Sequence, residues 1–152
     1  MGANQYVVLG FTGTRTGMSA AQKRTFAALV RELQPGTFRH GACVGADEDA
    51  AAIVRAECPL CRILAYPGVS ARGGDNNEHR SVKAIALSRE VMPEETHFAR
   101  NRRIVLGADL LVATPWQSEE PTASQGGTWY TIAFARRQKC KVRIIWPDGS
   151  EQ

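Results

Sequence analysis

The sequence has no long hydrophobic run. No apolar stretch approaches the roughly 20 residues that a membrane-spanning helix requires. The opening residues MGANQYVVLG also lack the basic start and long apolar core of a secretory signal. Neither sign of charge dominates, because 19 Lys and Arg against 15 Asp and Glu give a net charge of +4. We therefore expect a cytoplasmic protein without a membrane partner, for which an anionic ligand is permitted but not required.

Cysteine is scarce and poorly arranged for a metal site. Of the four cysteines, only Cys58 and Cys61 have the CxxC spacing, whereas Cys43 and Cys140 stand alone. A zinc ribbon needs a second pair of this kind, and a thioredoxin-like pair opens a helix rather than closing one. We therefore expect no metal, no cofactor and ordinary reduced thiols.

What the chain does have is a regular alternation of strand-like and helix-like segments. Its 152 residues, 43% of them hydrophobic, suit one globular domain. The predicted strands span residues 5–10, 37–42, 62–66, 109–114 and 142–146. The predicted helices run from a Ser19 cap to Leu33, over 47–57, from Pro93 to Gly107 and over 126–137, while 84–91 fits either type. This alternation predicts an α/β fold: one Rossmann-like, three-layer domain over residues 1–152 with a mainly parallel sheet flanked by helices.

Three turns fall where the predicted strands end, which is where open parallel sheets bind ligands. The first contains Thr12, Gly13, Thr14 and Arg15, and is neither a GxGxxG nor a Walker A lysine loop. Its glycine lets the backbone approach an anion, and its hydroxyls and guanidinium are phosphate donors. A tight connection from strand to helix explains the same residues equally well.

The second turn follows the predicted strand 37–42. Gly41 and Gly45 permit close approach of the backbone to a ligand. Asp47 has two possible roles, of which capping the next helix is favoured over accepting hydrogen bonds from a ribose. For His40, packing is favoured over catalysis.

The third turn joins the segment after Thr114 to a glycine-rich helix start. Two glycines before a helix leave its amides open to an anion. Trp116 and Trp129 either stack on a base or pack in the core. The candidate residues at the helix start are Gly126, Gly127 and Thr128.

The segment RNRRIV carries an asparagine between arginines on a predicted helix. At 100° per residue, Arg100 and Arg103 are expected to share one face while Asn101 points inward. A buried asparagine needs partners, so Asn101 either ties the helix to a loop or contacts the ligand. The basic residues 136–143 near the C-terminus favour a solvated helix end over a nucleic-acid surface.

Five segments together carry a resemblance to a known group. The segments, in order, are GFTGTR, HGACVGAD, RNRRIV, ADLLVATP and GGTWYTIAFAR, and the resemblance covers about residues 6–146. They resemble the SLOG superfamily, which includes the bacterial DNA-processing (DprA/Smf) proteins and the LONELY GUY phosphoribohydrolases. The sequence looks most like its small stand-alone bacterial and phage members. The resemblance implies a homo-oligomer that binds a nucleotide-derived ligand over the strand ends, through Thr12, Gly13, Thr14, Arg15, Gly45, Asp47, Gly126, Gly127 and Thr128. We add Gly41 and Thr114 from the turns and Asn101 from the predicted helix as further ligand-binding candidates.

The hydrolase branch of this group has a PGGxGTxxE motif, whose glutamate assists cleavage of the N-glycosidic bond. Here the leading proline is missing and Thr131 stands where the glutamate would fall. A threonine supplies no carboxylate for that chemistry. We therefore expect a binding protein, a sensor, carrier or sequestering protein for a nucleotide-derived signal. The alternative is a phosphoribohydrolase that uses Asp47 or Glu48, and single-stranded DNA binding is the least favoured function.

Overall fold

The computed structural model describes residues 4–70, 79–123 and 126–152. In these residues, six parallel strands form one sheet in the order β5-β3-β2-β1-β7-β8. Its strands are β1 (Asn4–Gly13), β2 (Pro35–His40), β3 (Arg62–Ala65), β5 (Glu90–Val91), β7 (Leu110–Thr114) and β8 (Lys141–Ile144). The predicted α/β architecture with a parallel sheet is confirmed.

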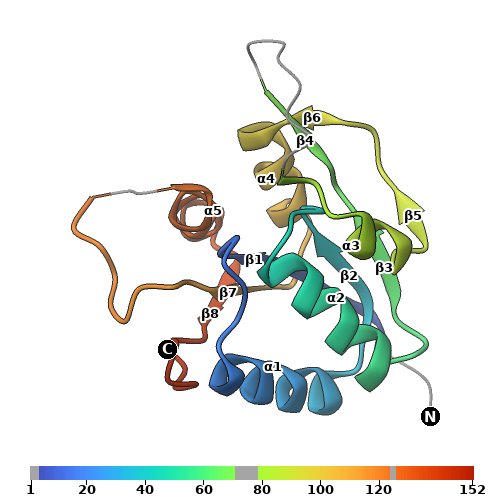
Figure 1. Cartoon of the computed structure of the whole chain (residues 1–152), viewed down its shortest axis with the longest axis horizontal. Helices are drawn as coiled ribbons and strands as arrows, with labels where there is room; N and C mark the ends of the chain where they lie inside the picture. The colour runs from blue at the N-terminus through green and yellow to red at the C-terminus, as the bar shows by residue number, and fades with distance from the viewer. Residues whose placement is uncertain (1–3, 71–78, 124–125) are drawn as a thin grey trace.

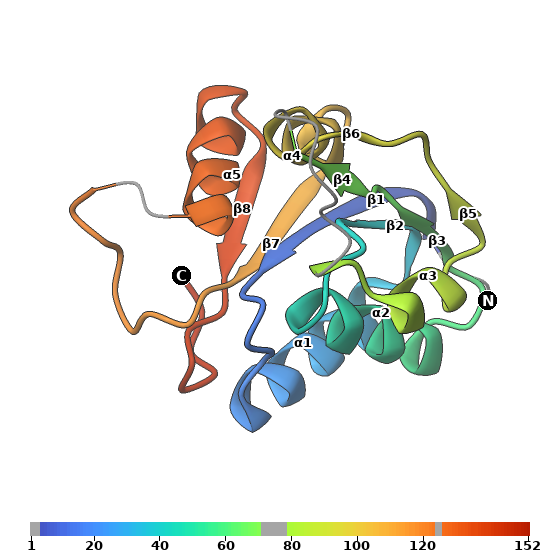
Figure 2. The same ribbon diagram turned by 45° about the horizontal axis from the view of Figure 1, so that its top comes forward.

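Helices cover both faces of the sheet and complete three layers (Figure 1). On one face lie α1 (Ala20–Leu33) and α2 (Ala46–Glu57), with the short α3 (Val82–Ala86) beside α2. On the other face, α4 (His97–Val105) and α5 (Gly126–Arg137) lie side by side, as Figure 2 shows from a second direction. Among the described residues, no helix is both long and apolar enough to cross a membrane.

Alternate residues of the central strands supply two apolar cores, because successive side chains of a strand point to opposite faces. On the α1 and α2 face, Phe11 packs against Phe26 and Phe38, with ring centroids 5.4 and 5.9 Å away. On the other face, Leu111 packs with the apolar residues of α4 and α5. Gly10 lies on that face, where a Cβ would approach the backbone oxygen of Ile104 to 3.0 Å.

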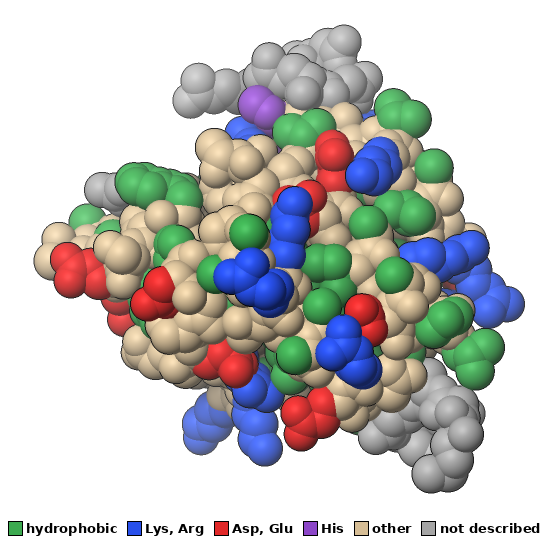
Figure 3. All heavy atoms as spheres, turned by 60° about the horizontal axis from the view of Figure 1, so that its bottom comes forward, with side chains coloured by type: hydrophobic (Ala, Val, Ile, Leu, Met, Phe, Trp, Pro, Cys, Tyr) green, Lys and Arg blue, Asp and Glu red, His purple; other side chains and the backbone are tan. Residues whose placement is uncertain are grey.

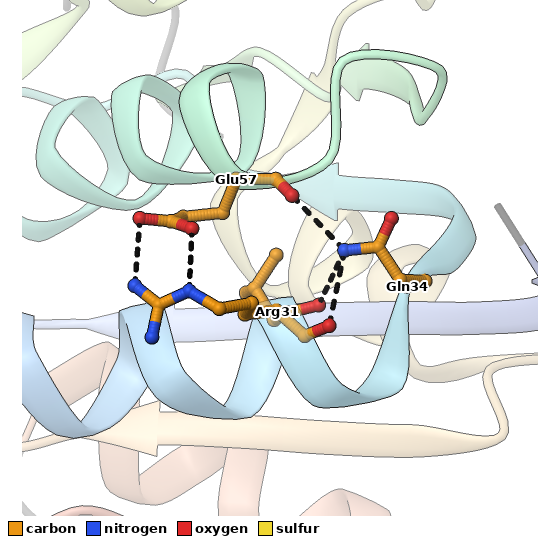
Figure 4. Close-up of polar contacts among 4 residues, drawn as sticks. Arg31, Gln34 and Glu57 are labelled. Atoms are coloured by element: carbon orange, nitrogen blue, oxygen red, sulfur yellow. Dashed lines mark hydrogen bonds and ion pairs between the residues drawn. The ribbon is translucent and has the colours of Figure 1, made fainter. Parts of the chain in front are cut away.

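The first helix begins as predicted. The Ser19 side chain accepts from the backbone N–H of Gln22, and the Gln22 side chain accepts from the backbone N–H of Ser19, which forms a capping box. The opposite end of α1 is tied to α2 through Arg31, which donates two hydrogen bonds to the Glu57 carboxylate at 2.9 and 3.0 Å (Figure 4). Gln34 donates to the Glu57 carbonyl oxygen at 2.9 Å. Because solvent screens this ion pair, it contributes little to stability.

Two predicted boundaries were wrong because distant strands pair there. The helix expected from Pro93 begins at His97, since β6 (Glu95–Thr96) pairs in parallel with β4 (Gly68–Val69) in a small second sheet. The first strand extends through Gly13, which pairs with Thr114 of β7. The ambiguous segment 84–91 contains the end of α3 and the strand β5. Part of the expected loops, residues 71–78 and 124–125, lies outside the described residues.

Candidate functional site

A cavity of about 360 Å³ opens beside the carboxyl ends of β1, β2 and β7. The chain proceeds outward from β1 to β2 and β3, then returns to the other side of β1 with β7 and β8. The helix that follows β1 therefore covers one face of the sheet, and the helix that follows β7 covers the other. This reversal point is where doubly wound folds bind their ligands.

The end of β1 contributes backbone and one exposed cation to the cavity. Thr12, Gly13, Thr14 and Arg15 all line it, and the Arg15 side chain is exposed. Gly13 is needed for packing, because a Cβ there would lie 2.4 Å from the Thr114 hydroxyl oxygen. The first turn is thus both a tight connection and a lining segment.

Asp47 does not cap α2, contrary to the favoured prediction. Gly45 occupies the N-cap position, whereas Asp47 is the second residue of the helix. Its Oδ2 accepts from the backbone N–H groups of Gly41 and Cys43, each at 3.1 Å, and so holds the loop after β2 against the helix. Burial raises the pKa of Asp47 to about 6, while Arg100 and these two amides act in the opposite direction.

Arg100 lines the cavity, which the sequence analysis did not predict. It is only 5% exposed, whereas Arg103 is exposed and pairs with Glu95. The two arginines therefore do not share a face. Arg100 Nη1 donates to the carbonyl oxygens of Gly41 and Tyr66, the residues that follow β2 and β3. Its position one turn before the buried Ile104 was the available signal, because residues four apart lie on one helix face.

Asn101 points inward, as predicted, and lies where α4 comes near the start of α5. Its Oδ1 accepts from Arg100 Nε at 2.7 Å. Its Nδ2 lies 3.5 Å from the position that a Cβ on Gly127 would occupy. Asn101 therefore lines the cavity where the two helices approach each other.

The first turn of α5 lines the opposite wall. Gly126 and Gly127 are exposed, and Gly126 has a φ of +73° with no atom within 4 Å of a Cβ position. Thr128 lines the cavity as well. Thr131, one turn further along, is buried and donates to the Gly127 carbonyl oxygen at 2.7 Å, so its hydroxyl is used within the helix.

The two candidate tryptophans lie in different environments. Trp129 is 4% exposed, packs on Trp146 with ring centroids 6.1 Å apart, and donates from Nε1 to Gln117 Oε1 at 3.1 Å. Trp116 is 65% exposed, and both tryptophans line the cavity. Core packing thus accounts for Trp129 and leaves Trp116 unexplained.

Three of the candidate residues do not line the cavity. A Cβ on Gly45 would lie 2.2 Å from the backbone oxygen of Arg15, so this glycine permits close packing of two backbone segments. The fully buried Thr114 has an Oγ1 that bonds to no other described residue. Glu48 is on α2 outside the lining. The candidates that do line it are Thr12, Gly13, Thr14, Arg15, Gly41, Asp47, Asn101, Gly126, Gly127 and Thr128.

His40 is a packed residue, as the sequence favoured. It is fully buried, and its Nδ1 accepts from the backbone N–H of Ala42 at 3.0 Å, while Nε2 lies 2.8 Å from Ser88 Oγ. Burial and then Arg100 lower the pKa of His40 to about 3. The imidazole is neutral and fixed in orientation, and it does not line the cavity.

Packing and ion pairs within the protein describe the surroundings of Cys58, Cys61 and two of the C-terminal basic residues. Cys58 ends α2 and Cys61 precedes β3, and burial raises the pKa of both thiols. Among the described residues, no group of three or more His, Cys, Asp or Glu side chains is suited to hold a metal. In the basic cluster, Arg136 pairs with Glu120 and Arg143 pairs with Glu151. Figure 3 shows basic side chains (blue) and acidic side chains (red) interspersed over the face that is at the bottom in Figure 1.

Comparison with known proteins identifies a fold but no family. No protein-family model matches this sequence, and no curated protein is detectably similar to it. Among solved structures, it is similar to the molybdenum cofactor binding protein from the phototrophic bacterium Rippkaea orientalis, with a TM-score of 0.64 and 16% identity. The match covers 92% of this chain and 76% of that chain. At this identity it establishes a shared Rossmann-like fold, and membership of the SLOG superfamily stays a prediction.

Proposed function

We propose that this protein binds a phosphorylated, nucleotide-derived small molecule in the cavity, as a carrier, sensor or sequestering protein. The observation that carries this proposal is that the Thr12–Arg15 segment and the first turn of α5 line one cavity at the reversal point of the sheet. The volume of about 360 Å³ lies within the range of small-molecule sites.

The walls of the cavity are suited to an anionic group. The first N–H groups of a helix have no intrahelical acceptor, and the helix dipole makes that end positive. At the start of α5, the N–H groups of Gly127 and Thr128 each follow a glycine, which has no side chain to keep an oxyanion away. We place a phosphate on the amides of Gly127 and Thr128, with the Arg15 guanidinium supplying a further charge-assisted contact.

The similar solved structure supports the binding of a small molecule, but it does not indicate which one. That protein binds a cofactor, the molybdenum cofactor, on the same fold. The resemblance to the SLOG superfamily points more narrowly to nucleotide-derived signals, including those of the cyclic ADP-ribose type. Both would be held by the same phosphate-binding and hydroxyl-binding groups.

Calorimetry against a panel of compounds tests this proposal. The panel contains nucleoside monophosphates, ADP-ribose, ribose 5-phosphate, inorganic phosphate and the molybdenum cofactor, and native mass spectrometry of protein purified from cells searches for a retained ligand. We expect at least one phosphorylated compound to bind with a Kd well below 1 mM. A Kd of 1 mM corresponds to a binding free energy of about −4 kcal/mol. If nothing in the panel binds below 1 mM and no ligand is retained, the proposal is wrong.

One observation favours a second candidate, a phosphoribohydrolase. The Asp47 carboxyl lines the cavity, and its pKa of about 6 is suited to proton transfer near neutral pH. Incubation with nucleoside monophosphates, followed by chromatography for free base, tests this activity. Base release that disappears in Asp47→Asn would establish hydrolysis. Binding without release would exclude it for the compounds tested.

A further inference from the structure

An exposed tryptophan stands where β7 ends, at one side of the cavity. Trp116 is 65% exposed, although the residues on either side of it are fixed. The carbonyl oxygen of Pro115 accepts from the buried Gln22 side chain at 2.9 Å, and Gln117 Oε1 accepts from Trp129 Nε1 at 3.1 Å. Both neighbours of Trp116 are thus hydrogen-bonded, Pro115 through its backbone and Gln117 through its side chain, while the indole of Trp116 remains accessible to a ligand.

The order of the strands sets the distance from Trp116, which follows β7, to the part of the cavity that follows β2. β7 and β2 are the two neighbours of β1, and neighbouring strands lie about 4.8 Å apart. The segments that follow β7 and β2 are therefore separated by roughly 10 Å, with Thr12–Arg15 between them. A ligand that contacts both Gly41, which follows β2, and Trp116 has to be longer than a phosphate alone.

The chemistry of an accessible indole selects one class of ligand group. Its π face stacks on planar aromatic rings, and stacking of a base on an aromatic side chain tolerates any base because each has a π face. Trp129 cannot take this role, since its indole is packed on Trp146 and its N–H is used by Gln117.

We infer that Trp116 is the stacking platform for an aromatic base, and that the ligand is therefore a base-containing nucleotide rather than a sugar phosphate. This inference rests on the proposed function, because it places the base at the β7 side of the same cavity that holds the phosphate.

The test compares two probes that differ only in the base. AMP and ribose 5-phosphate are titrated by calorimetry into the wild-type protein and into Trp116→Ala, Trp116→Phe and Leu60→Ala. Leu60 is the matched control, because it is 73% exposed and lies outside the cavity, between α2 and β3. Chromatography of the samples verifies that AMP stays intact.

We expect wild-type protein to bind AMP more tightly than ribose 5-phosphate. Trp116→Ala should weaken AMP binding by roughly 5- to 150-fold, the usual effect of losing one base stack, and leave ribose 5-phosphate within twofold. Trp116→Phe should stay within about fivefold of wild type for AMP, since a phenyl ring still stacks. Leu60→Ala should bind both probes as wild type does.

Each other result overturns the inference. If wild-type protein binds AMP no better than ribose 5-phosphate, or if Trp116→Ala binds AMP as wild type does, Trp116 holds no base and the phosphate site stands alone. If Trp116→Ala loses both probes equally, the indole supports the shape of the cavity. If neither probe binds wild-type protein with a Kd below 1 mM, while another compound of the panel does, the base-stacking inference is wrong and the proposed function is retained.

Discussion

Replacing Asp47 with asparagine tests the electrostatics of the cavity wall. Asp47 is 6% exposed, and its Oδ2 accepts two backbone hydrogen bonds, from Gly41 and Cys43. Burial raises its pKa from 3.8 to about 6, even though Arg100 favours the ionised form. Asparagine has nearly the same shape, and its side-chain oxygen accepts the same hydrogen bonds without carrying a charge.

The direction of the effect follows from the raised pKa. The folded protein holds the proton of Asp47 more tightly than the unfolded chain does. The stabilisation from the protonated carboxyl is therefore fully present below pH 3.8 and is lost as the pH rises through about 6. At about 1.4 kcal/mol per pKa unit, the ionised carboxylate costs the folded state roughly 3 kcal/mol at pH 8. Asp47→Asn avoids this cost.

Urea denaturation of both proteins at about pH 4, 6 and 8 measures the difference. We expect Asp47→Asn to be more stable than wild type at pH 8, by up to about 3 kcal/mol, and to approach it at pH 4. Groups that titrate equally in both proteins cancel in this comparison. The opposite trend, in which wild type gains on the variant as the pH rises, would show that pairing with Arg100 outweighs burial and would refute the reasoning.

Three further predictions concern binding and backbone packing. Arg15→Ala should weaken binding of the phosphorylated ligand by about 1.5–3 kcal/mol without changing Tm, whereas Arg24→Ala, exposed on α1, should leave calorimetric affinity unchanged. Gly127→Val should stay folded by circular dichroism but lose binding, since its side chain would enter the cavity; unfolding or unchanged affinity would contradict this. Gly45→Ala should destabilise the protein by several kcal/mol in urea denaturation, because its Cβ meets the Arg15 backbone at 2.2 Å. Gly107→Ala, with a similar positive φ but its nearest contact at 3.8 Å, should cost only about 1–2 kcal/mol.

Local signals predicted those parts of the fold that local interactions determine. The Ser19 cap and the helix over Gly126–Arg137 were placed correctly, because caps, glycines and helical spacing depend on residues that are close together in the sequence. The start of α4 was misplaced because Glu95 and Thr96 pair with Gly68 and Val69, more than 25 residues earlier in the chain. No pattern within a short window reports such a pairing.

The meeting of the three turns at one cavity was predictable, but the contacts that each residue makes there were not. Parallel strands place their carboxyl ends at one edge of a sheet, so three turns far apart in sequence were expected to meet there. Within that edge, a glycine that admits a ligand and a glycine that admits another backbone segment look identical in sequence. Gly127 borders the cavity, whereas Gly45 is packed against Arg15, and only the tertiary contacts distinguish them.

Arg100 determines the shape of the cavity although its own hydrogen bonds are made to protein groups and not to a ligand. Its guanidinium binds the carbonyl oxygens of Gly41 and Tyr66 and the side chain of Asn101, so it fixes the ends of two strands and one wall of the cavity. It also lowers the pKa of Asp47 against the effect of burial. Without Arg100, these acceptors would be left buried and unpaired and Asp47 would lose its nearby cation, each at a cost of a few kcal/mol. The shape of the cavity in which we propose that Arg15 and the α5 amides bind a ligand therefore depends on a buried arginine whose hydrogen bonds are made within the protein.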